Sequence, residues 1–275
     1  MEFQAVIFDL DGTLLNTIAD LTCAGNKALV GCGFCERTEE DFKYFVGSGR
    51  NNMVLRMLPP EACANSETVE KAERIFDEYY SAHMIDKTVP YPGIAELLHA
   101  LKKEGVKLAV VSNKPDEFVQ PLIEREFPGV FDAVCGQQGG IIKPDPAGVN
   151  RALTLMGISA SQALYVGDSG VDMQTAQNAQ CRSCGVTWGF RTKKELVQNG
   201  ADHTVDTPLE LFGLIQGKQP AGKAKRLFSL AVAAIMILCL VGVVVSLARG
   251  DVTGVTAGII FPVVLGFASV RLLRR

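Results

Sequence analysis

The stretch AVIFDLDGT, residues 5–13, decides the fold of this chain. Its first four residues are apolar, which is typical of a short strand buried on both faces of a parallel sheet. Asp9 and Asp11 follow at once, and Gly12 permits a sharp turn of the backbone after them. Parallel sheets bind their ligands at the edge where the strands end. The stretch therefore predicts both an α/β fold and the place of its functional site.

Outward from this strand, similar apolar runs alternate with helical patterns. The further runs occupy residues 106–112, 131–136, 163–168, 184–189 and 201–206. The helical patterns occupy residues 94–105, 115–126, 146–156, 170–179 and 193–199. This alternation predicts a Rossmann-like parallel sheet with helices on both faces. We expect this core to comprise residues 1–14 and 89–216.

Residues 15–88 interrupt the alternation. They show helical periodicity and no convincing strand, so we expect a small helical cap inserted after the first strand. The stretch TVPYPG, residues 88–93, returns the chain to the core. Its two prolines restrict the backbone and its glycine permits a turn, which is typical of a hinge.

Two pairs of acidic residues follow predicted strands. Asp9 and Asp11 end the first strand, and Asp168 and Asp172 follow the run at 163–168. A single Asp at such a place is more often a turn residue or a helix cap. Two pairs at the same edge of a sheet are harder to explain in that way. Carboxylates that crowd together repel, and a hard cation such as Mg²⁺ relieves the repulsion.

Three further polar residues complete the candidate site at this edge. Ser112 and Asn113 end the run at 106–112, where they either bind a phosphoryl oxygen or cap the next helix. Lys143 precedes a proline and is either a phosphate-binding cation or a solvated loop residue. In the predicted cap, Arg50 follows a glycine-bearing loop. It either meets a substrate carboxylate or second phosphate, or is solvated.

The segments DLDGTLL (9–15), VSN (111–113), KPDP (143–146) and GDSGVD (167–172) together resemble the four motifs of the haloacid dehalogenase superfamily of phosphohydrolases. Their order and spacing match over residues 1–215, and the helical insertion resembles that superfamily's small cap. The subgroup that the chain resembles most is the phosphoglycolate phosphatase-like one.

The resemblance implies a role for each candidate residue. Asp9 is the expected nucleophile, which forms an aspartyl-phosphate, and Asp11 is the expected general acid and base. Mg²⁺ is expected to be held by the carboxylates of Asp9 and Asp168 and by the backbone carbonyl of Asp11. Asp172 is expected to support the ion directly or indirectly. The transferring phosphoryl group is expected to be bound by Ser112, Asn113 and Lys143.

The expected substrate is a small phosphomonoester resembling phosphoglycolate. Pyrophosphate, a nucleotide or a sugar phosphate, the last including a mutase reaction, are alternatives within the same fold. A membrane-anchored regulatory module with an inactive hydrolase fold is the alternative from another class of protein.

Charge and hydropathy divide the 275 residues into two parts. Residues 1–222 carry a net charge of −9 and residues 223–275 one of +6. The acidic part disfavours nucleic-acid binding, and the 48% of apolar residues excludes intrinsic disorder. Residues 217–226 form a polar linker. The uncharged segments 227–248 and 252–270 then predict a transmembrane hairpin within residues 227–271.

The bases that flank this hairpin predict its orientation. They stand before its first segment and after its second, which places the catalytic domain and both termini on the cytoplasmic side. The N-terminus does not resemble a signal peptide. The two CxxC pairs, Cys32/Cys35 and Cys181/Cys184, are either a zinc site or coincidences among small buried residues.

Overall fold

The strand β1 (Ala5–Phe8) lies inside a parallel sheet of six strands. It pairs with β4 (Lys107–Pro115) on one side and with β6 (Ala163–Gly167) on the other. The sheet is completed by β5 (Ala133–Gln137), β7 (Arg182–Val186) and β8 (His203–Val205), in the order β5-β4-β1-β6-β7-β8. Every residue of β1 is buried. The predicted α/β fold with its parallel sheet is therefore confirmed.

The computed structural model describes residues 1–218, of which Met1–Gly217 form one compact unit. Within this described part, no helix combines the length and the apolar character that crossing a bilayer requires. The predicted membrane-spanning segments, 227–248 and 252–270, lie outside the described residues, as does most of the predicted linker.

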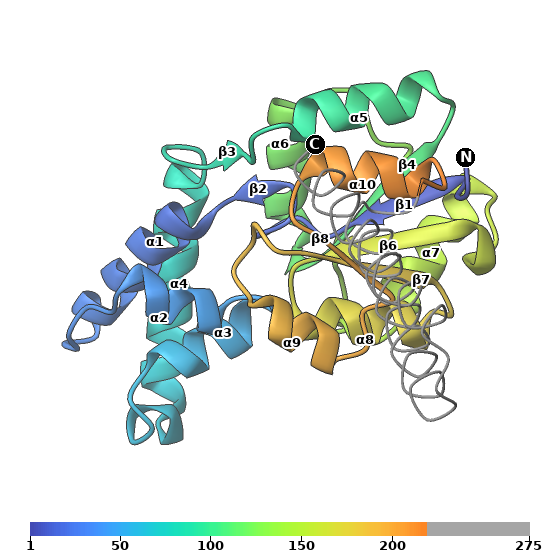
Figure 1. Ribbon diagram of the computed structural model, residues 1–275. Coiled ribbons are helices and arrows are strands. Elements are labelled where there is room, and N and C mark those ends of the chain that lie inside the picture. The colour runs from blue at the N-terminus through green and yellow to red at the C-terminus, as the bar shows by residue number, and fades with distance from the viewer. Residues whose placement is uncertain (219–275) are drawn as a thin grey trace, which may run out of the picture. The chain divides into compact units, whose positions relative to one another are not determined.

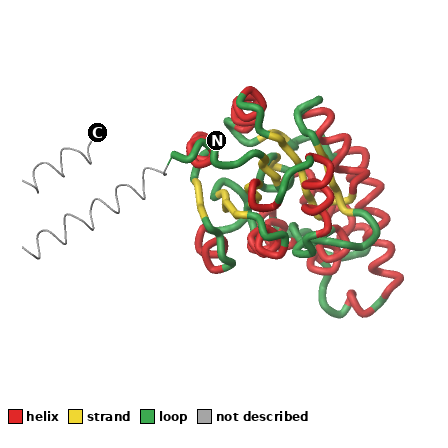
Figure 2. Tube along the Cα trace, turned by 90° about the vertical axis from the view of Figure 1, so that its right-hand side faces the viewer, coloured by secondary structure: helices red, strands yellow, loops and turns green. Residues whose placement is uncertain are grey.

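Helices cover both faces of the sheet, as Figures 1 and 2 show. One face packs against α5 (Ile94–Lys103), α6 (Asp116–Glu126) and α10 (Pro208–Ile215). The other packs against α7 (Ala147–Met156) and α8 (Gly170–Asn178). A shorter helix, α9 (Lys193–Gln198), lies between β7 and β8 in the chain.

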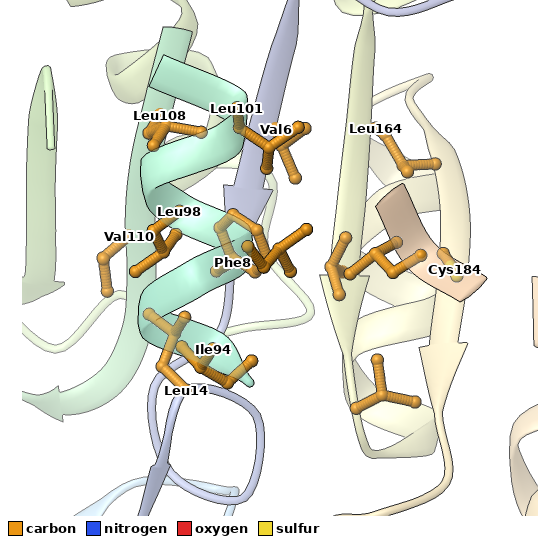
Figure 3. Close-up of a cluster of buried hydrophobic side chains, with 14 of the residues drawn as sticks. Val6, Phe8, Leu14, Ile94, Leu98, Leu101, Leu108, Val110, Leu164 and Cys184 are labelled. Carbon is orange, nitrogen blue, oxygen red and sulfur yellow. The ribbon is translucent and has the colours of Figure 1, made fainter. Parts of the chain in front are cut away.

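Alternation of side chains along β1 explains how both faces are filled. Val6 and Phe8 belong to the cluster beneath α5, which Figure 3 shows with Leu98 and Leu101 of that helix. Ala5 and Ile7 belong to the cluster on the opposite face. Successive side chains of a strand point to opposite faces, so an uninterrupted apolar run is what a doubly covered strand requires.

The insertion after β1 is a helical cap with its own apolar core. It contains α1 (Ile18–Gly31), α2 (Glu39–Phe45), α3 (Arg50–Met57), a short 3₁₀ helix (Ala62–Ala64) and α4 (Ser66–His83). Phe42, Met57 and Phe76 are among the buried residues that these helices contribute to one cluster. The cap is thus stabilised by its own packing as well as by its attachment to the sheet.

The structure differs from the expectation that residues 15–88 contain no strand. Leu15–Asn16 form β2, which pairs in antiparallel fashion with β3 (Val89–Pro90). The chain therefore enters and leaves the cap through one two-stranded ribbon. A strand of two residues has no measurable periodicity, so the hydrophobic pattern gives no sign of it.

Asp20 stabilises the end of the cap that adjoins the β2–β3 ribbon. Its buried carboxylate, in the first turn of α1, accepts hydrogen bonds from the backbone N–H groups of Lys87 and Thr88 and from the hydroxyl of Thr88, at 2.8–3.1 Å. Hydrogen bonds to a charged acceptor are stronger than those between neutral groups. Asp20 thus joins the first helix of the cap to the segment that leaves it.

We expect Asp20→Ala to lower the free energy of unfolding by about 2–4 kcal/mol, because the buried backbone N–H and the buried hydroxyl of Thr88 lose their acceptor. Urea denaturation of the chain ending at Lys218 measures this. Asp86→Ala is the matched control, since the Asp86 side chain is 53% exposed and its pair with His83 is worth little. Equal losses in the two variants would contradict the role of Asp20.

Candidate active site

The predicted site residues gather where β1, β4 and β6 end. Asp9 directly follows β1, Ser112 and Asn113 lie near the end of β4, and Asp168 directly follows β6. These strands are neighbours in a parallel sheet, so their carboxyl ends lie at one edge. Asp172 reaches the same place from the first turn of α8.

Three carboxylates form the centre of the site. Asp9, Asp168 and Asp172 are all buried, and one oxygen of each lies within 4.8 Å of the others. Burial, together with the charges of Asp172 and Asp168, raises the pKa of Asp9 well above its usual value. Burial and the charge of Asp172 raise the pKa of Asp168 to about 7. Such a donor set of hard oxygens fits a divalent cation of the Mg²⁺ type.

Lys143 supplies positive charge inside this cluster. Its Nζ lies 2.7 Å from an oxygen of Asp9 and 2.7 Å from an oxygen of Asp172. Although burial alone lowers it, the two carboxylates raise the pKa of Lys143 well above its usual value, so the side chain stays charged. Asn113 fixes the lysine backbone, because its amide accepts from the Lys143 N–H at 2.6 Å and donates to the Lys143 carbonyl at 3.2 Å.

The three carboxylates differ in how many of their oxygens contact a hydrogen-bond donor or an ammonium group. One oxygen of Asp172 accepts from the backbone N–H and hydroxyl of Ser169, at 3.0 and 2.6 Å, and the other contacts Lys143. Asp168 accepts from the N–H of Phe190 on one oxygen and from Thr13 on the other. Among the described residues, only one oxygen of Asp9 has a donor, that of Lys143. Its other oxygen is the one best placed to attack an electrophile.

The segment 188–190 holds Asp168 in place, which the sequence did not reveal. Besides the N–H of Phe190, this segment contributes Trp188, whose indole donates to the carbonyl of Thr13 at 3.0 Å. A Cβ atom on Gly189 would come within 2.3 Å of Asp168 and of the Gly12 carbonyl. Only glycine fits there, because the backbone must approach the carboxylate closely.

The neighbouring Arg191 links this segment to the cap. Its guanidinium donates to the backbone carbonyls of Lys43 and Val46, and packs on the ring of Tyr44. The segment that holds Asp168 therefore also holds the end of α2. The apolar run that contains Trp188 is visible in the sequence, but the partners of Arg191 lie far away along the chain and no local pattern predicts them.

The Asp11 carboxylate is not part of the three-carboxylate group. Its two oxygens lie 3.0 and 3.2 Å from the Nζ of Lys114, a residue that the sequence analysis did not single out. Lys114 is buried, and its ammonium lies 4.8 Å from the ring centroid of Tyr80 in the cap. Its place directly after Ser112 and Asn113 at a strand end was the signal that could have identified it.

Core and cap together line one pocket above these residues. The core contributes Asp9, Asp11, Ser112, Lys114 and Lys143. Apolar side chains that line it include Met53, Phe76, Tyr80 and Phe118. The carboxylate with a free oxygen therefore lines a partly open pocket that also has apolar walls.

Arg50 lines the pocket, but it is already paired. It is the first residue of α3, and its guanidinium lies 3.2 Å from Glu73 and 3.3 Å from Asp77, both on α4. The side chain is only 24% exposed. It is therefore neither a freely solvated residue nor an unpaired cation that faces the substrate.

The CxxC pairs do not form a metal site in the part of the chain that the structure describes. The single group there with metal-binding geometry is the carboxylate cluster, and it contains no cysteine. Cys181 and Cys184 are buried in the core, whereas Cys32 and Cys35 lie in the cap region.

Comparisons with known proteins agree with this geometry. The haloacid dehalogenase-like hydrolase family matches residues 6–186. A phosphoglycolate phosphatase from Pseudomonas putida is 35% identical over 220 residues, which cover 78% of this chain and 79% of the relative. One from Vibrio parahaemolyticus is 31% identical over 222 residues, covering 78% and 96%.

A solved structure shares the fold as well. A protein from Lactobacillus delbrueckii, provisionally assigned as a phosphoglycolate phosphatase, superposes with a TM-score of 0.74 at 40% identity. The match covers 78% of this chain and 99% of that one. The chain therefore belongs to the haloacid dehalogenase-like hydrolases.

Proposed function

We propose that this chain is a Mg²⁺-dependent phosphatase that hydrolyses a small phosphomonoester of the phosphoglycolate type. The observation that carries the proposal is the Asp9 carboxylate, which lines the pocket with one oxygen held by Lys143 and the other without a donor among the described residues. The relatives named phosphoglycolate phosphatase support the substrate class.

The first step is attack of the free Asp9 oxygen on phosphorus. A bond forms between that oxygen and phosphorus, the bond to the leaving oxygen breaks, and Asp11 gives its proton to that leaving oxygen. In the second step Asp11 takes a proton from water, which attacks the phosphoryl group and releases Asp9. Lys143 and Ser112 bind the transferring group in both steps.

Asp9, Asp168 and Asp172 are the residues that would hold Mg²⁺. The ion would supply positive charge to the phosphoryl oxygens when bound. The buried carboxylates favour a cation for a physical reason, since Lys143 is the single cation within 4 Å of Asp9 and Asp172 among the described residues. Asp11 contributes no carboxylate to this group because its side chain is paired with Lys114.

The pocket favours a small substrate over a nucleotide or a large sugar phosphate. Phe76 and Tyr80 of α4 are fully buried in the cap and line the same pocket as Asp9. Their apolar rings narrow the pocket on the cap side, which favours a small leaving group. The intact set of Asp9, Asp11 and Lys143 also argues against an inactive regulatory module.

We further propose that segments 227–248 and 252–270 anchor the enzyme to a membrane as a helical hairpin. Both segments are uncharged and have about the length that spans a hydrocarbon core of roughly 30 Å. The bases that flank the pair favour an arrangement with the catalytic domain and both termini in the cytoplasm. The partners of the chain are then a small phosphorylated metabolite and the lipid bilayer.

The catalytic proposal predicts that Asp9→Asn lowers kcat by at least about 1,000-fold with any phosphomonoester, because the amide is a poor nucleophile. A phosphate-release assay with p-nitrophenyl phosphate and with 2-phosphoglycolate measures this. Lys143 keeps its pair with Asp172, so the variant is expected to fold. Asp86→Asn is the control with an exposed carboxylate. Turnover that survives Asp9→Asn would rule out the aspartyl-phosphate route.

The raised pKa of Asp168 predicts pH-dependent metal binding. Between about pH 4 and 7 the folded protein holds a proton on Asp168 that the unfolded chain has lost, so this group makes stability fall as pH rises through that range. Mg²⁺ must displace the proton below about pH 7. We therefore expect the Mg²⁺ affinity to fall between pH 8 and pH 6.

Isothermal titration calorimetry of EDTA-treated protein measures the affinity, and thermal denaturation measures the stabilisation by Mg²⁺. We expect a larger rise in Tm with Mg²⁺ at pH 8 than at pH 6. Asp168→Asn should abolish the rise and stabilise the EDTA-treated protein at pH 8. An affinity that is constant between pH 6 and 8 would contradict the assignment of Asp168.

The membrane proposal predicts that the full chain sediments with membranes and resists carbonate extraction, whereas the chain ending at Lys218 stays in the soluble fraction. Ile237→Arg combined with Leu240→Arg should release the full chain, because each arginine near the centre of a span costs about 2.5–3.5 kcal/mol. Recovery of the unaltered full chain in the soluble fraction would exclude the hairpin.

A further inference from the structure

Lys114 is a buried cation to which the two-step reaction assigns no task. It stands next to the end of β4, its side chain is 5% exposed, and it lines the pocket. Burying a lysine is costly unless a partner compensates for it. The one carboxylate that contacts its ammonium among the described residues is that of Asp11.

Lys114 lies near the expected position of the leaving group, because both are close to Asp11. To donate its proton, Asp11 must lie about 2.6–3.2 Å from the leaving oxygen. The Nζ of Lys114 lies 3.0 and 3.2 Å from the two oxygens of the same carboxylate. A carboxylate attached one carbon away from the ester oxygen extends about 2.5–3 Å beyond it, given ordinary bond lengths. Such a group lies within reach of the ammonium.

Tyr80 adds a second, independent sign of a ligand. Its hydroxyl is buried, and the O–H proton has no acceptor among the described residues. Burial raises the pKa of Tyr80 to about 12, so this proton is retained at neutral pH. The ring lies 4.8 Å from the Lys114 ammonium, and both residues line the pocket. A buried donor without an acceptor costs about 1–3 kcal/mol, which an anionic ligand would recover.

Arg50, the cation singled out from the sequence, is less suited to this task. Two carboxylates, those of Glu73 and Asp77, already surround its guanidinium. This group carries a net negative charge, and an added anion would be repelled by it. Lys114 faces a single carboxylate, and Tyr80 beside it offers a donor.

We propose that Lys114 is the residue that determines substrate specificity, by binding a carboxylate one carbon away from the ester oxygen of the substrate. The substrate class is then the phosphate esters of 2-hydroxy acids, of which 2-phosphoglycolate is the smallest. The proposal rests on the proposed phosphatase function and narrows it. Tyr80 donates its O–H to the same carboxylate.

The test compares two substrates on the full chain, 2-phosphoglycolate and ethyl phosphate, which differ by a carboxylate in place of a methyl group. We expect kcat/KM of the unaltered protein to favour 2-phosphoglycolate by about 100-fold or more, the ratio that one or two charge-assisted hydrogen bonds supply. Lys114→Met should reduce that ratio to below about 5-fold. Lys114→Arg should retain most of it, and Arg50→Met should leave it unchanged.

The ratio of the two kcat/KM values distinguishes two roles of Lys114: binding the substrate carboxylate and positioning Asp11. If Lys114 only positioned Asp11, Lys114→Met would slow both substrates equally and leave the ratio intact, which would overturn the proposal. A ratio that collapses in Arg50→Met and survives in Lys114→Met would overturn it as well. If Lys114→Met fails to fold, the ratio in the unaltered protein and in Lys114→Gln decides in the same way.

A binding measurement separates this proposal from the phosphatase function. Calorimetry with 3-phosphonopropionate and propylphosphonate, which cannot be hydrolysed, should show about 100-fold tighter binding of the first, and Lys114→Met should remove the difference. If that holds while neither ester is hydrolysed, the anion site stands and the phosphatase function fails. If the esters are hydrolysed without preference and the analogues bind equally, the phosphatase function stands and the role of Lys114 is refuted.

Discussion

The crowding of three buried carboxylates around one ammonium is the constraint on which the rest of the structure depends. One oxygen of each carboxylate lies within 4.8 Å of the others, and two charges at that limit repel by about 3.5 kcal/mol at an effective dielectric constant of 20. The structure opposes this repulsion with donors for Asp168 and Asp172 and with the charge of Lys143. Within residues 1–218, it leaves one oxygen of Asp9 without a donor. The same network that keeps the cluster together therefore also distinguishes the nucleophile from its neighbours.

Parallel-strand rules were enough to predict most of this site. Apolar runs located the strands, and the carboxyl ends of adjacent parallel strands must meet, so Asp9, Ser112 and Asp168 were expected together. Lys143 was singled out as a lysine just before a proline-fixed turn. In the fold, β2 and β3 were missed because two residues show no periodicity.

The residues that the sequence did not reveal act through partners distant in the chain. Lys114 and Asp11 are 103 positions apart, and a lysine at a strand end gives no sign of the direction in which its flexible side chain points. Arg50 was expected at the site, but its pairing with Glu73 and Asp77 depends on how α3 packs against α4. Local sequence patterns predict individual helices and strands. Which side chain on another helix or strand a residue contacts is set by tertiary packing.

The β2–β3 ribbon allows the cap and the sheet to evolve separately. Because β2 and β3 are paired, the chain leaves the sheet and returns to it at neighbouring points, whatever lies between them. The entropic cost of closing a loop grows only slowly with its length, so an insertion there can lengthen, shorten or be exchanged with little loss to the sheet. The fold thus separates two evolutionary problems. Cap residues that line the pocket, such as Tyr80, can change in a replaceable module, while Lys114 and the carboxylate chemistry are inherited with the sheet.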